Sequence, residues 1–289
     1  MTLQPHPVKG RLPVLLSMRQ KFGPRLSWRE SIFNLWTVVA LIFMLGGYVV
    51  TDVIAQSASA TQTRSILAVL LIWTPTLATG FGFNVLISVI SMAIGTVLGV
   101  GLGISQVSTN NSIRQISWIV TQFFRNSPWL VLLFYCIFLI PFNVEIFGVN
   151  IPLPGWFKAI IGLSLPVMAN MSEYMRGAIQ SIPSGQWESA ASLGFSRGQI
   201  MREIILPQTI KRVLPSWMNL YAVLTMATPL VSIVGVNEVM SLTRAALSAE
   251  SRVELLIPMY LYIMCWFFIY CYPISLVTAR LERKFAVNL

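Results

Sequence analysis

Charge, histidine and cysteine are all scarce in this chain of 289 residues, and each shortage excludes a class of protein. Charged residues make up 10% of the sequence, well below the roughly 25% of a soluble globular domain. The only histidine is His6, which excludes a metal site built on several histidines. The cysteines Cys136, Cys265 and Cys271 are an odd number within apolar runs, which argues against a disulfide framework.

Two signatures of catalysis are also missing. The sequence contains no GxxxxGK[ST] phosphate-binding loop, so the chain cannot hydrolyse ATP as a P-loop ATPase. It also shows no nucleophile–base pair and no cluster of metal ligands. We therefore expect no catalytic residue, no metal site and no cofactor bound by the chain itself.

Long apolar runs stand where charge is missing, since 55% of the residues are hydrophobic. A transmembrane helix needs roughly 20 apolar residues, and unpaired backbone cannot face lipid. The runs therefore predict an all-α integral membrane protein. We expect about six spans, near residues 32–54, 83–104, 118–140, 157–179, 213–236 and 255–279. Pro75, Gly80 and Gly82 interrupt residues 66–82, which are expected to form an interfacial or re-entrant segment on the outer side.

The distribution of positive charge predicts the orientation in the membrane. Lysines and arginines concentrate in residues 1–31, 197–212 and 280–284, and the net charge is +10. Because cytoplasmic loops are rich in Lys and Arg, both termini and the 180–212 loop are expected in the cytoplasm. The charge thus indicates orientation in the lipid bilayer and not a nucleic acid partner. Residues 1–31 are expected to form a basic cytoplasmic segment, and they do not have the pattern of a signal peptide.

Three glycines recur every four residues within the 83–104 run, at Gly95, Gly99 and Gly103. Small residues at this spacing allow two helices to approach closely. The pattern predicts helix packing and not a nucleotide-binding loop, because it lies inside an apolar run.

The polar loop at residues 180–212 carries the most specific pattern in the chain. A short helix is expected after Pro183, with a negative side chain near its positive end. Trp187, Ala191 and Phe195 are four residues apart and are expected to share one helix face. Such a face suits a groove on another protein. The alternative is an amphipathic helix that lies in the lipid headgroups.

The spacing of this loop resembles the cytoplasmic "EAA" loop of importer permeases of the ATP-binding cassette class. It reads Glu188-Ser189-Ala190, three residues, Gly194, nine residues and Ile204-x-Leu206-Pro207. In the fixed positions the only departure is Ser189, where the family usually has Ala. From about residue 79 onward the chain is similar to the polar amino acid uptake branch, in segments such as 125–128, 169–179 and 228–232.

The resemblance implies a five-helix type I importer permease core at residues 83–289, preceded by one additional helix at 32–54. In such importers two permeases, identical or different, form the pathway above two ATPase subunits that bind ATP and Mg. An external binding protein delivers the solute, and a cytoplasmic coupling helix fits a cleft on each ATPase. The implied location is the bacterial inner membrane. The expected ATPase-coupling residues, including two inferred aromatic anchors, are Trp187, Glu188, Ser189, Ala190, Gly194 and Phe195.

Of the charges within the predicted spans, Arg125 and Glu173 are the two that we single out, toward the cytoplasmic ends of their spans. A charge in the membrane usually faces the interior of the helix bundle. We expect the two to pair and to hold the third and fourth spans together. Separate snorkelling to the interface and direct contact with the solute are the alternatives.

The solute is the least determined feature of the sequence. Members of the branch often carry polar or charged residues where this chain has Leu132, Leu220 and Met226-Ala227. The subunit is therefore expected either to be the non-binding half of a heterodimer, which we prefer, or to carry a less charged solute. Backbone at a broken helix near residues 228–229 could also contact the solute. The expected pathway residues are Asn219, Met226, Thr228 and Ser232.

The leading hypothesis is a permease subunit of an ATP-driven importer for amino acids or related polar solutes. The same class of importer could carry an opine, an osmolyte or a similar solute. A secondary transporter would need ion-coupling residues in mid-membrane, and these are not evident. A membrane scaffold without transport is the remaining alternative.

Overall fold

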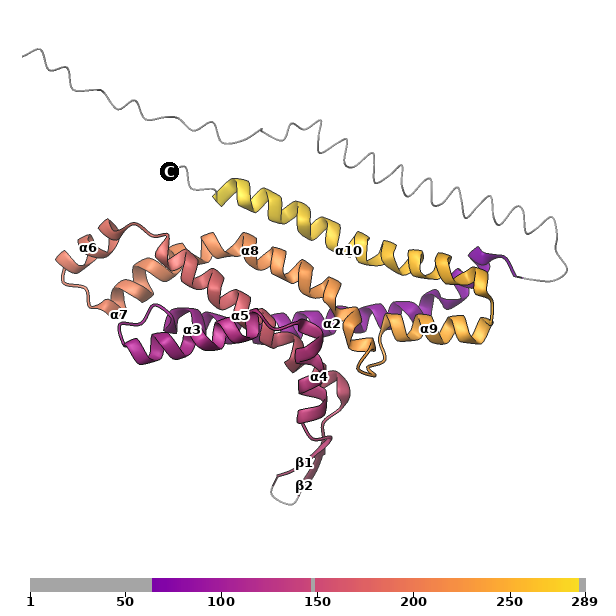
Figure 1. Ribbon diagram of the computed structural model, residues 1–289. Helices are drawn as coiled ribbons and strands as arrows, with labels where there is room; N and C mark the ends of the chain where they lie inside the picture. Colours follow the sequence, from indigo (N-terminus) through magenta and orange to yellow (C-terminus); the bar gives the residue numbers. More distant parts are fainter. Residues whose placement is uncertain (1–63, 147–148, 286–289) are drawn as a thin grey trace, which may run out of the picture. The chain divides into compact units, whose positions relative to one another are not determined.

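The computed structural model describes residues 64–146 and 149–285, and the predicted segments 1–31 and 32–54 lie outside these ranges. Four long helices dominate the described part: α2 (Ile66–Ser105), α5 (Gly155–Gln180), α8 (Leu206–Ala227) and α10 (Leu256–Phe285). Helix α5 packs against both α2 and α8, and α8 packs against α10 (Figure 1). The other helices are α3 (Asn111–Arg125), α4 (Trp129–Leu139), α6 (Ser184–Ser192), α7 (Arg197–Gln199) and α9 (Val239–Glu250).

Short elements of other kinds join these helices. A π-helical segment, η1 (Ile200–Ile205), leads into α8, and two 3-10 segments, η2 (Thr228–Ser232) and η3 (Val253–Leu255), precede α9 and α10. Strands β1 (Asn143–Ile146) and β2 (Val149–Pro152) form an antiparallel hairpin between α4 and α5, with Asn143 opposite Pro152.

Helix α2 is one continuous helix of 40 residues, so the separate re-entrant segment predicted at 66–82 is not formed. At 1.5 Å per residue such a helix is about 60 Å long, roughly twice the hydrocarbon core of a bilayer. Its first half continues through Pro75 because α9 and α10 cover it. Leu77 is buried against Val239 and Ile263, and Trp73 Nε1 donates to Glu250 Oε1 at 2.9 Å.

The predicted span at 118–140 is two helices, α3 and α4, with a break at residues 126–128. Pro128 has no backbone N–H and disfavours helical backbone in the residue before it, so α3 ends before this proline. The C-terminal end of α4 is held by Lys158 of α5, which is fully buried. Its Nζ donates to the carbonyls of Ile137 at 3.3 Å and Ile140 at 2.8 Å, and lies 3.4 Å from the ring centre of Phe142.

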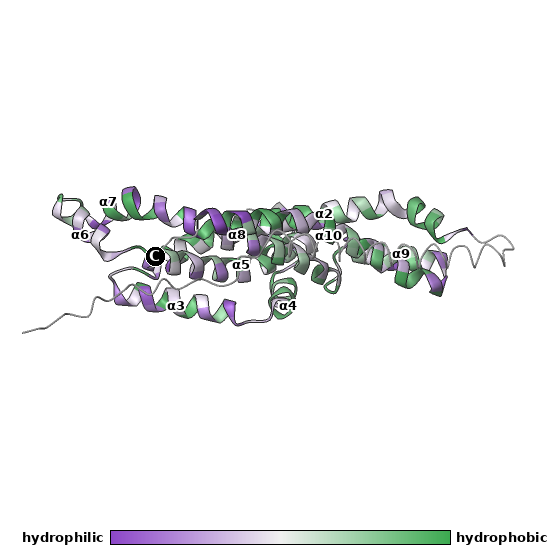
Figure 2. Cartoon of the chain, turned by 90° about the horizontal axis from the view of Figure 1, so that it is seen from above, coloured by the Kyte–Doolittle hydropathy of each residue, from purple (hydrophilic) through white to green (hydrophobic). Residues whose placement is uncertain are grey.

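Two stretches of the described chain are both long enough and apolar enough to cross a membrane, Ile66–Ser105 and Val253–Lys284, with mean hydropathy 2.3 and 1.8. Helices α5 and α8, with 26 and 22 residues, have sufficient length but a more polar composition. Figure 2 shows polar and apolar residues mixed along α3 and near α6 and α7, and apolar residues in α4. The total of about six spans stays a prediction.

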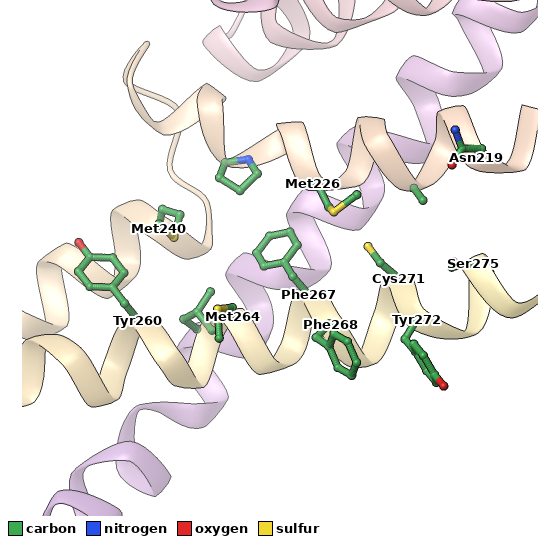
Figure 3. A pocket seen from close by; sticks show the side chains of 13 residues that line it. Asn219, Met226, Met240, Tyr260, Met264, Phe267, Phe268, Cys271, Tyr272 and Ser275 are labelled. Atoms are coloured by element: carbon green, nitrogen blue, oxygen red, sulfur yellow. The ribbon is translucent and has the colours of Figure 1, made fainter. Parts of the chain in front are cut away.

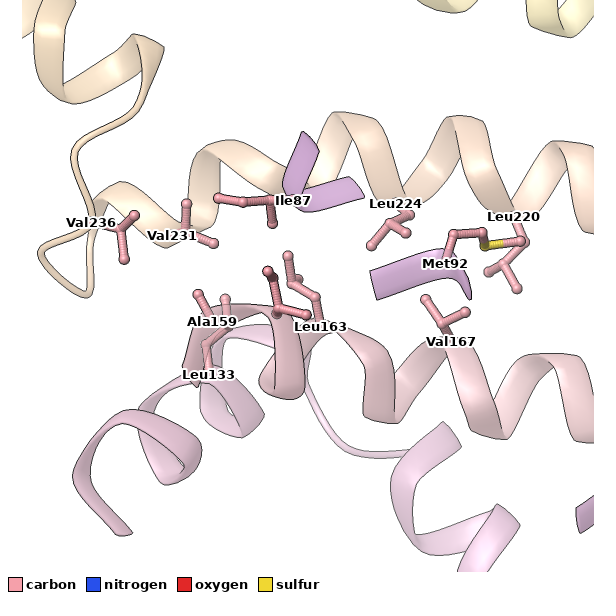
Figure 4. Packing of buried hydrophobic residues seen from close by; sticks show 11 residues of the cluster. Ile87, Met92, Leu133, Ala159, Leu163, Val167, Leu220, Leu224, Val231 and Val236 are labelled. Carbon is pink, nitrogen blue, oxygen red and sulfur yellow. The ribbon is translucent and has the colours of Figure 1, made fainter. Parts of the chain in front are cut away.

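The main apolar core lies where α2, α4, α5 and α8 meet, and Figure 4 shows its side chains. Leu163 and Val167 of α5 contact the cluster from one side, and Leu224 of α8 closes it from the other. Leu220, one of the positions where the branch often has a polar residue, is buried in this core.

The packing predicted from Gly95, Gly99 and Gly103 is confirmed, because all three glycines are buried against α5. A Cβ atom at Gly99 would lie 2.6 Å from the carbonyl oxygen of Met168 and 2.6 Å from Met171 Cβ. The lack of side chains at these three positions therefore sets how closely α2 approaches α5.

We predict that Gly99→Ala lowers the midpoint of thermal unfolding of the purified protein in detergent. The added Cβ must push α5 away, and overpacking of this kind costs about 1–3 kcal/mol. Gly101→Ala is the matched control on the same helix, because a Cβ atom added there would meet no described atom within 4 Å. Both changes raise helix propensity equally, so equal midpoints for the two variants would contradict the assignment of the glycines to packing.

Candidate coupling loop and pathway residues

Helix α6 ends in a left-handed turn that requires glycine. Gly194 has φ +82°, a region that residues with a Cβ rarely occupy. The N–H of Phe195 donates to the carbonyl of Ala190 at 3.2 Å, and the N–H of Gly194 donates to that of Ala191 at 3.0 Å. These two bonds form a Schellman motif, which satisfies carbonyls at the end of the helix and reverses the chain. The conformation of the turn thus explains the glycine of the loop pattern.

The turn places the loop residues differently from the sequence-based expectation. Because α6 ends at Ser192, Phe195 does not continue the helix face of Trp187 and Ala191. Ala190 is buried, and Trp187 is half-buried against an apolar cluster formed by the ends of α5, η1 and α8. Trp187 therefore anchors α6 to its own chain, whereas Ala191 lies exposed.

The exposed apolar surface of the loop centres on Leu193, a residue that the sequence analysis missed. Its side chain is 78% exposed and that of Phe195 is 39% exposed. Glu188, Ser189 and Gly194 of the predicted coupling set are also exposed. A shallow hollow of about 550 Å³ beside Leu193 is lined by Pro183, Gly185, Gln186, Ser189, Ala190, Leu193 and Ile204. The position of Leu193 directly before the helix-ending glycine was the available signal, because a residue there lies at the tip of the loop.

The return from α6 to α8 passes through the π-helical segment η1. Pro207 has no N–H, so it cannot donate to the carbonyl one turn earlier. The N–H of Leu206 donates instead to the carbonyl of Met201, five residues back. Arg212 then closes the loop at its base, since its Nη1 donates to Ser181 Oγ at 2.8 Å and to the Ser181 carbonyl at 3.0 Å. These bonds tie α8 to the end of α5.

Two of the four predicted pathway residues line one cavity. Asn219 and Met226 of α8 border a hollow of about 650 Å³ between α8, α9 and α10. Figure 3 shows Met226 and Phe267 directed toward each other across it. The described lining residues include no Asp, Glu, Lys or Arg. The rest of the lining is mostly apolar or aromatic and consists of Ala222, Pro229, Met240, Tyr260, Ile263, Met264, Phe268, Cys271, Tyr272 and Ser275.

The other two pathway residues lie outside the lining of that cavity. The predicted break in the helix is confirmed, because α8 ends at Ala227 and continues as the 3-10 segment η2. Thr228 is fully buried, and Ser232 donates its hydroxyl to the carbonyl of Pro229 at 2.8 Å. Both residues stabilise the turn of the backbone.

Thr228 belongs to a buried polar cluster that the sequence analysis also missed. Asn84 of α2 donates through Nδ2 to Thr228 Oγ1 at 3.0 Å and to Glu238 Oε2 at 2.9 Å. Glu238 Oε1 accepts from the N–H groups of Met240 at 2.9 Å and Ser241 at 3.1 Å, so it caps α9. All of Asn84, Thr228 and Glu238 are fully buried. The cluster joins α2 to η2 and to the start of α9, two elements that lie far from α2 in the sequence.

The structure brings Arg125 and Glu173 together, with Nη1 and Oε1 3.7 Å apart. Arg176, one turn along α5, also hydrogen-bonds Glu173. Glu173 is thus shared by two arginines, and Arg125 is its contact from α3. That this contact holds α3 to α5 stays a prediction.

Within residues 64–146 and 149–285 no group of His, Cys, Asp and Glu is arranged to hold a metal ion.

Comparison with known proteins gives consistent matches. A family model described as "Binding-protein-dependent transport system inner membrane component" matches residues 94–287. The probable amino-acid ABC transporter permease protein YckA of Bacillus subtilis is 37% identical over 166 residues, which cover 57% of this chain and 71% of the relative. The putative glutamine transport system permease protein GlnP of Rickettsia felis is 31% identical over 201 residues, covering 70% and 88%. The crystal structure of an amino acid ABC transporter with histidines shares the fold, with a TM-score of 0.65 at 24% identity over 77% of this chain and 100% of that chain.

We predict that Gly194→Ala loosens α6, because forcing an L-residue into the left-handed region costs about 1–2 kcal/mol. Hydrogen–deuterium exchange of residues 184–195 in the purified protein measures the effect as faster exchange. Gly185→Ala is the control within the same helix and is expected to slow exchange, since alanine favours the helix. Equal exchange in the two variants would contradict the requirement for glycine at 194.

We predict that Asn84→Ala lowers the midpoint of thermal unfolding, because the buried Glu238 carboxylate loses a donor at a cost of about 1–3 kcal/mol. Asn170→Ala is the control, since the Asn170 amide donates at 2.8 Å only to the carbonyl of Pro166 within its own helix. A loss of stability in Asn84→Ala no larger than in the control would contradict the role assigned to the polar cluster.

Proposed function

Because the chain belongs to the family of binding-protein-dependent transport system inner membrane components, we propose that it forms half of an import pathway for amino acids. The chain is a permease subunit of an ATP-binding cassette importer and is not itself an enzyme. Such a permease works in the inner membrane with an ATPase, an external binding protein and a second permease. The solute, the stoichiometry and the roles of single residues are parts of the proposal.

The exposed end of α6 is the observation that carries the coupling role. It projects Leu193 and Phe195 outward beside a shallow hollow, within the residues that the family model matches. An apolar side chain at the tip of a helix suits a groove on a partner, where a few buried residues provide most of the binding energy. In the proposal Leu193 and Phe195 are the contacts with the ATPase, and Glu188 and Ser189 border them.

The geometry of the loop supports transmission of movement from α6 to the helices behind it. Ala190 and Trp187 attach α6 to the cluster that contains the ends of α5 and α8. The hydrogen bonds between Arg212 and Ser181 join the start of α8 to the end of α5 at the two ends of the loop. A displacement of α6 therefore acts on α5 and α8 together. Helix α8 also lines the 650 Å³ cavity, so the same movement changes the width of that cavity.

The names of the relatives favour an amino acid as the solute, since two of them are named for amino-acid or glutamine transport. The apolar lining of the cavity favours an uncharged group, because an unpaired charge buried there would be costly. We propose that this subunit pairs with a different permease that holds the charged head group. Asn219 and Met226 are then the contacts of this subunit with the solute or its path.

The arrangement proposed for the whole transporter follows the distribution of charge. Two ATPase subunits, which bind ATP and Mg, lie beneath α6 on the cytoplasmic side. Both termini of the chain lie on that side as well, because its basic segments are expected to face the cytoplasm. The binding protein approaches from the outer side, and no nucleic acid takes part.

The function is tested by reconstituting the complete complex in liposomes, with ATP inside and loaded binding protein outside. We expect uptake of a labelled neutral amino acid that requires ATP and the binding protein. Uptake driven by an ion gradient without ATP would overturn the importer assignment.

In the same liposomes we predict that Leu193→Ala reduces the ATP hydrolysis stimulated by the binding protein about tenfold, as expected for loss of an interface anchor. Leu139→Ala is the matched control, since Leu139 on α4 is also 78% exposed. Co-purification of the tagged ATPase with each variant measures the contact directly. Equal retention of the ATPase by both variants would contradict the role of Leu193.

A further inference from the structure

A second cavity lies behind α6, on the side opposite to the exposed Leu193. It has a volume of about 860 Å³ and lies between the end of α2, the start of α3, the end of α5 and the helices α6 and α7. The half-buried face of Trp187 forms part of its wall. The proposed contact with the ATPase does not use this cavity, because it opens on the other face of α6.

The charged residues that line this cavity are all positive. Arg114 lies in the first turn of α3 and Arg197 starts α7, so the two approach from different elements. The described lining includes no Asp or Glu. Arg114 donates one N–H to Asn111 Oδ1 at 2.7 Å, and its remaining N–H groups are available. The positive end of the α3 dipole adds to the attraction for an anion.

The wall of the cavity has two chemical characters. Hydroxyl and amide side chains accompany the arginines, among them Thr109, Gln180 and Ser184. Ile179 and Ile182, by contrast, belong to the buried apolar cluster beneath α6. The cavity thus presents a basic polar part and an apolar part side by side, which fits an amphiphile better than a small hydrophilic ion.

The walls are held in place by hydrogen bonds from three helices. Gln106, which lines the cavity, donates through Nε2 to Thr121 Oγ1 at 2.9 Å and to Ser172 Oγ at 2.7 Å. These bonds join α2, α3 and α5 beneath the cavity. Arg176 Nη1 donates to Gln180 Oε1 at 2.8 Å and fixes that side chain as well.

We propose that this cavity binds the phosphate-bearing headgroup of an anionic phospholipid from the inner leaflet. The proposal rests on the proposed function for the cytoplasmic side of the loop, where anionic lipids attract basic residues. Arg114 and Arg197 contact the phosphate, and the apolar wall contacts the upper part of the acyl chains. A bound lipid would support α6 from behind, so the anionic lipid content of the membrane would affect the coupling of ATP hydrolysis to transport.

The test is native mass spectrometry of the complex, purified with its ATPase from nanodiscs that contain phosphatidylglycerol or phosphatidylcholine. We expect selective retention of phosphatidylglycerol by the unaltered protein. In the double variant Arg114→Gln/Arg197→Gln we expect the affinity for phosphatidylglycerol to fall about thirtyfold. Each of the two arginines near the anionic surface contributes to the binding free energy, and both contributions are lost together. The double variant Arg202→Gln/Lys211→Gln is the control, since it removes two positive charges from the 180–212 segment and neither residue lines the cavity.

Each other outcome overturns the proposal. Equal losses in the double variant and in the control would mean non-specific attraction by surface charge. Displacement of the lipid by millimolar inorganic phosphate would mean a site for free phosphate. Cross-linking of an Arg114→Cys variant to the ATPase would mean that an acidic segment of the partner fills the cavity. Lipid retention can be measured on the permease alone, so failure of the proposed coupling role would be recognised separately.

Discussion

The close contact between α2 and α5 is the constraint on which the described structure depends. The buried glycines of α2 let it lie directly against the backbone of α5 at Met168 and Ser172. Since the hydrophobic effect does not drive helices together in lipid, van der Waals contact of this kind contributes to the attraction between them. With α2 in this position, α5 can contact α3 and α4 on one side and α8 on the other. The core around Leu163 and the hydrogen bonds of Gln106 to Thr121 and Ser172 both form on this pair.

The loop at α6 is an exposed element on a rigid base. Its outward tip depends on the left-handed glycine, and its inward face depends on Ala190 and Trp187. The two sides of the helix therefore have different chemistry. One side presents apolar residues to a partner, whereas the other borders a basic cavity at the height proposed for the lipid headgroups. Protein and lipid can thus contact the same nine-residue helix without competing for it.

Local patterns in the sequence predicted the features that local chemistry determines. The glycine stripe, the loop and the break at Thr228 follow from spacing and from proline, and the structure has all three. Long-range partners decided the rest. Helix α2 runs through Pro75 because residues of α9 and α10, which lie far along the chain, cover it. Trp187 turns inward because the ends of α5, η1 and α8 form an apolar cluster against it, and Glu238 is buried because Asn84 meets it from another helix. Periodicity of one segment contains no information about such partners.

The polar cluster at Asn84 also has a consequence for the order of assembly during synthesis. Asn84 and Glu238 are 154 residues apart in the chain. At roughly 5–20 residues per second, about 8–30 seconds separate the synthesis of these two partners. During that interval the Asn84 amide lies in a lipid-inserted or lipid-adjacent helix without its carboxylate. The helices that follow α2 can pack while the Asn84 amide still lacks this hydrogen bond, and the cluster is complete only after α9 has been synthesised. An Asn84 amide without its partner is therefore a property of the unfinished chain, which a membrane protease or chaperone could distinguish from the completed fold.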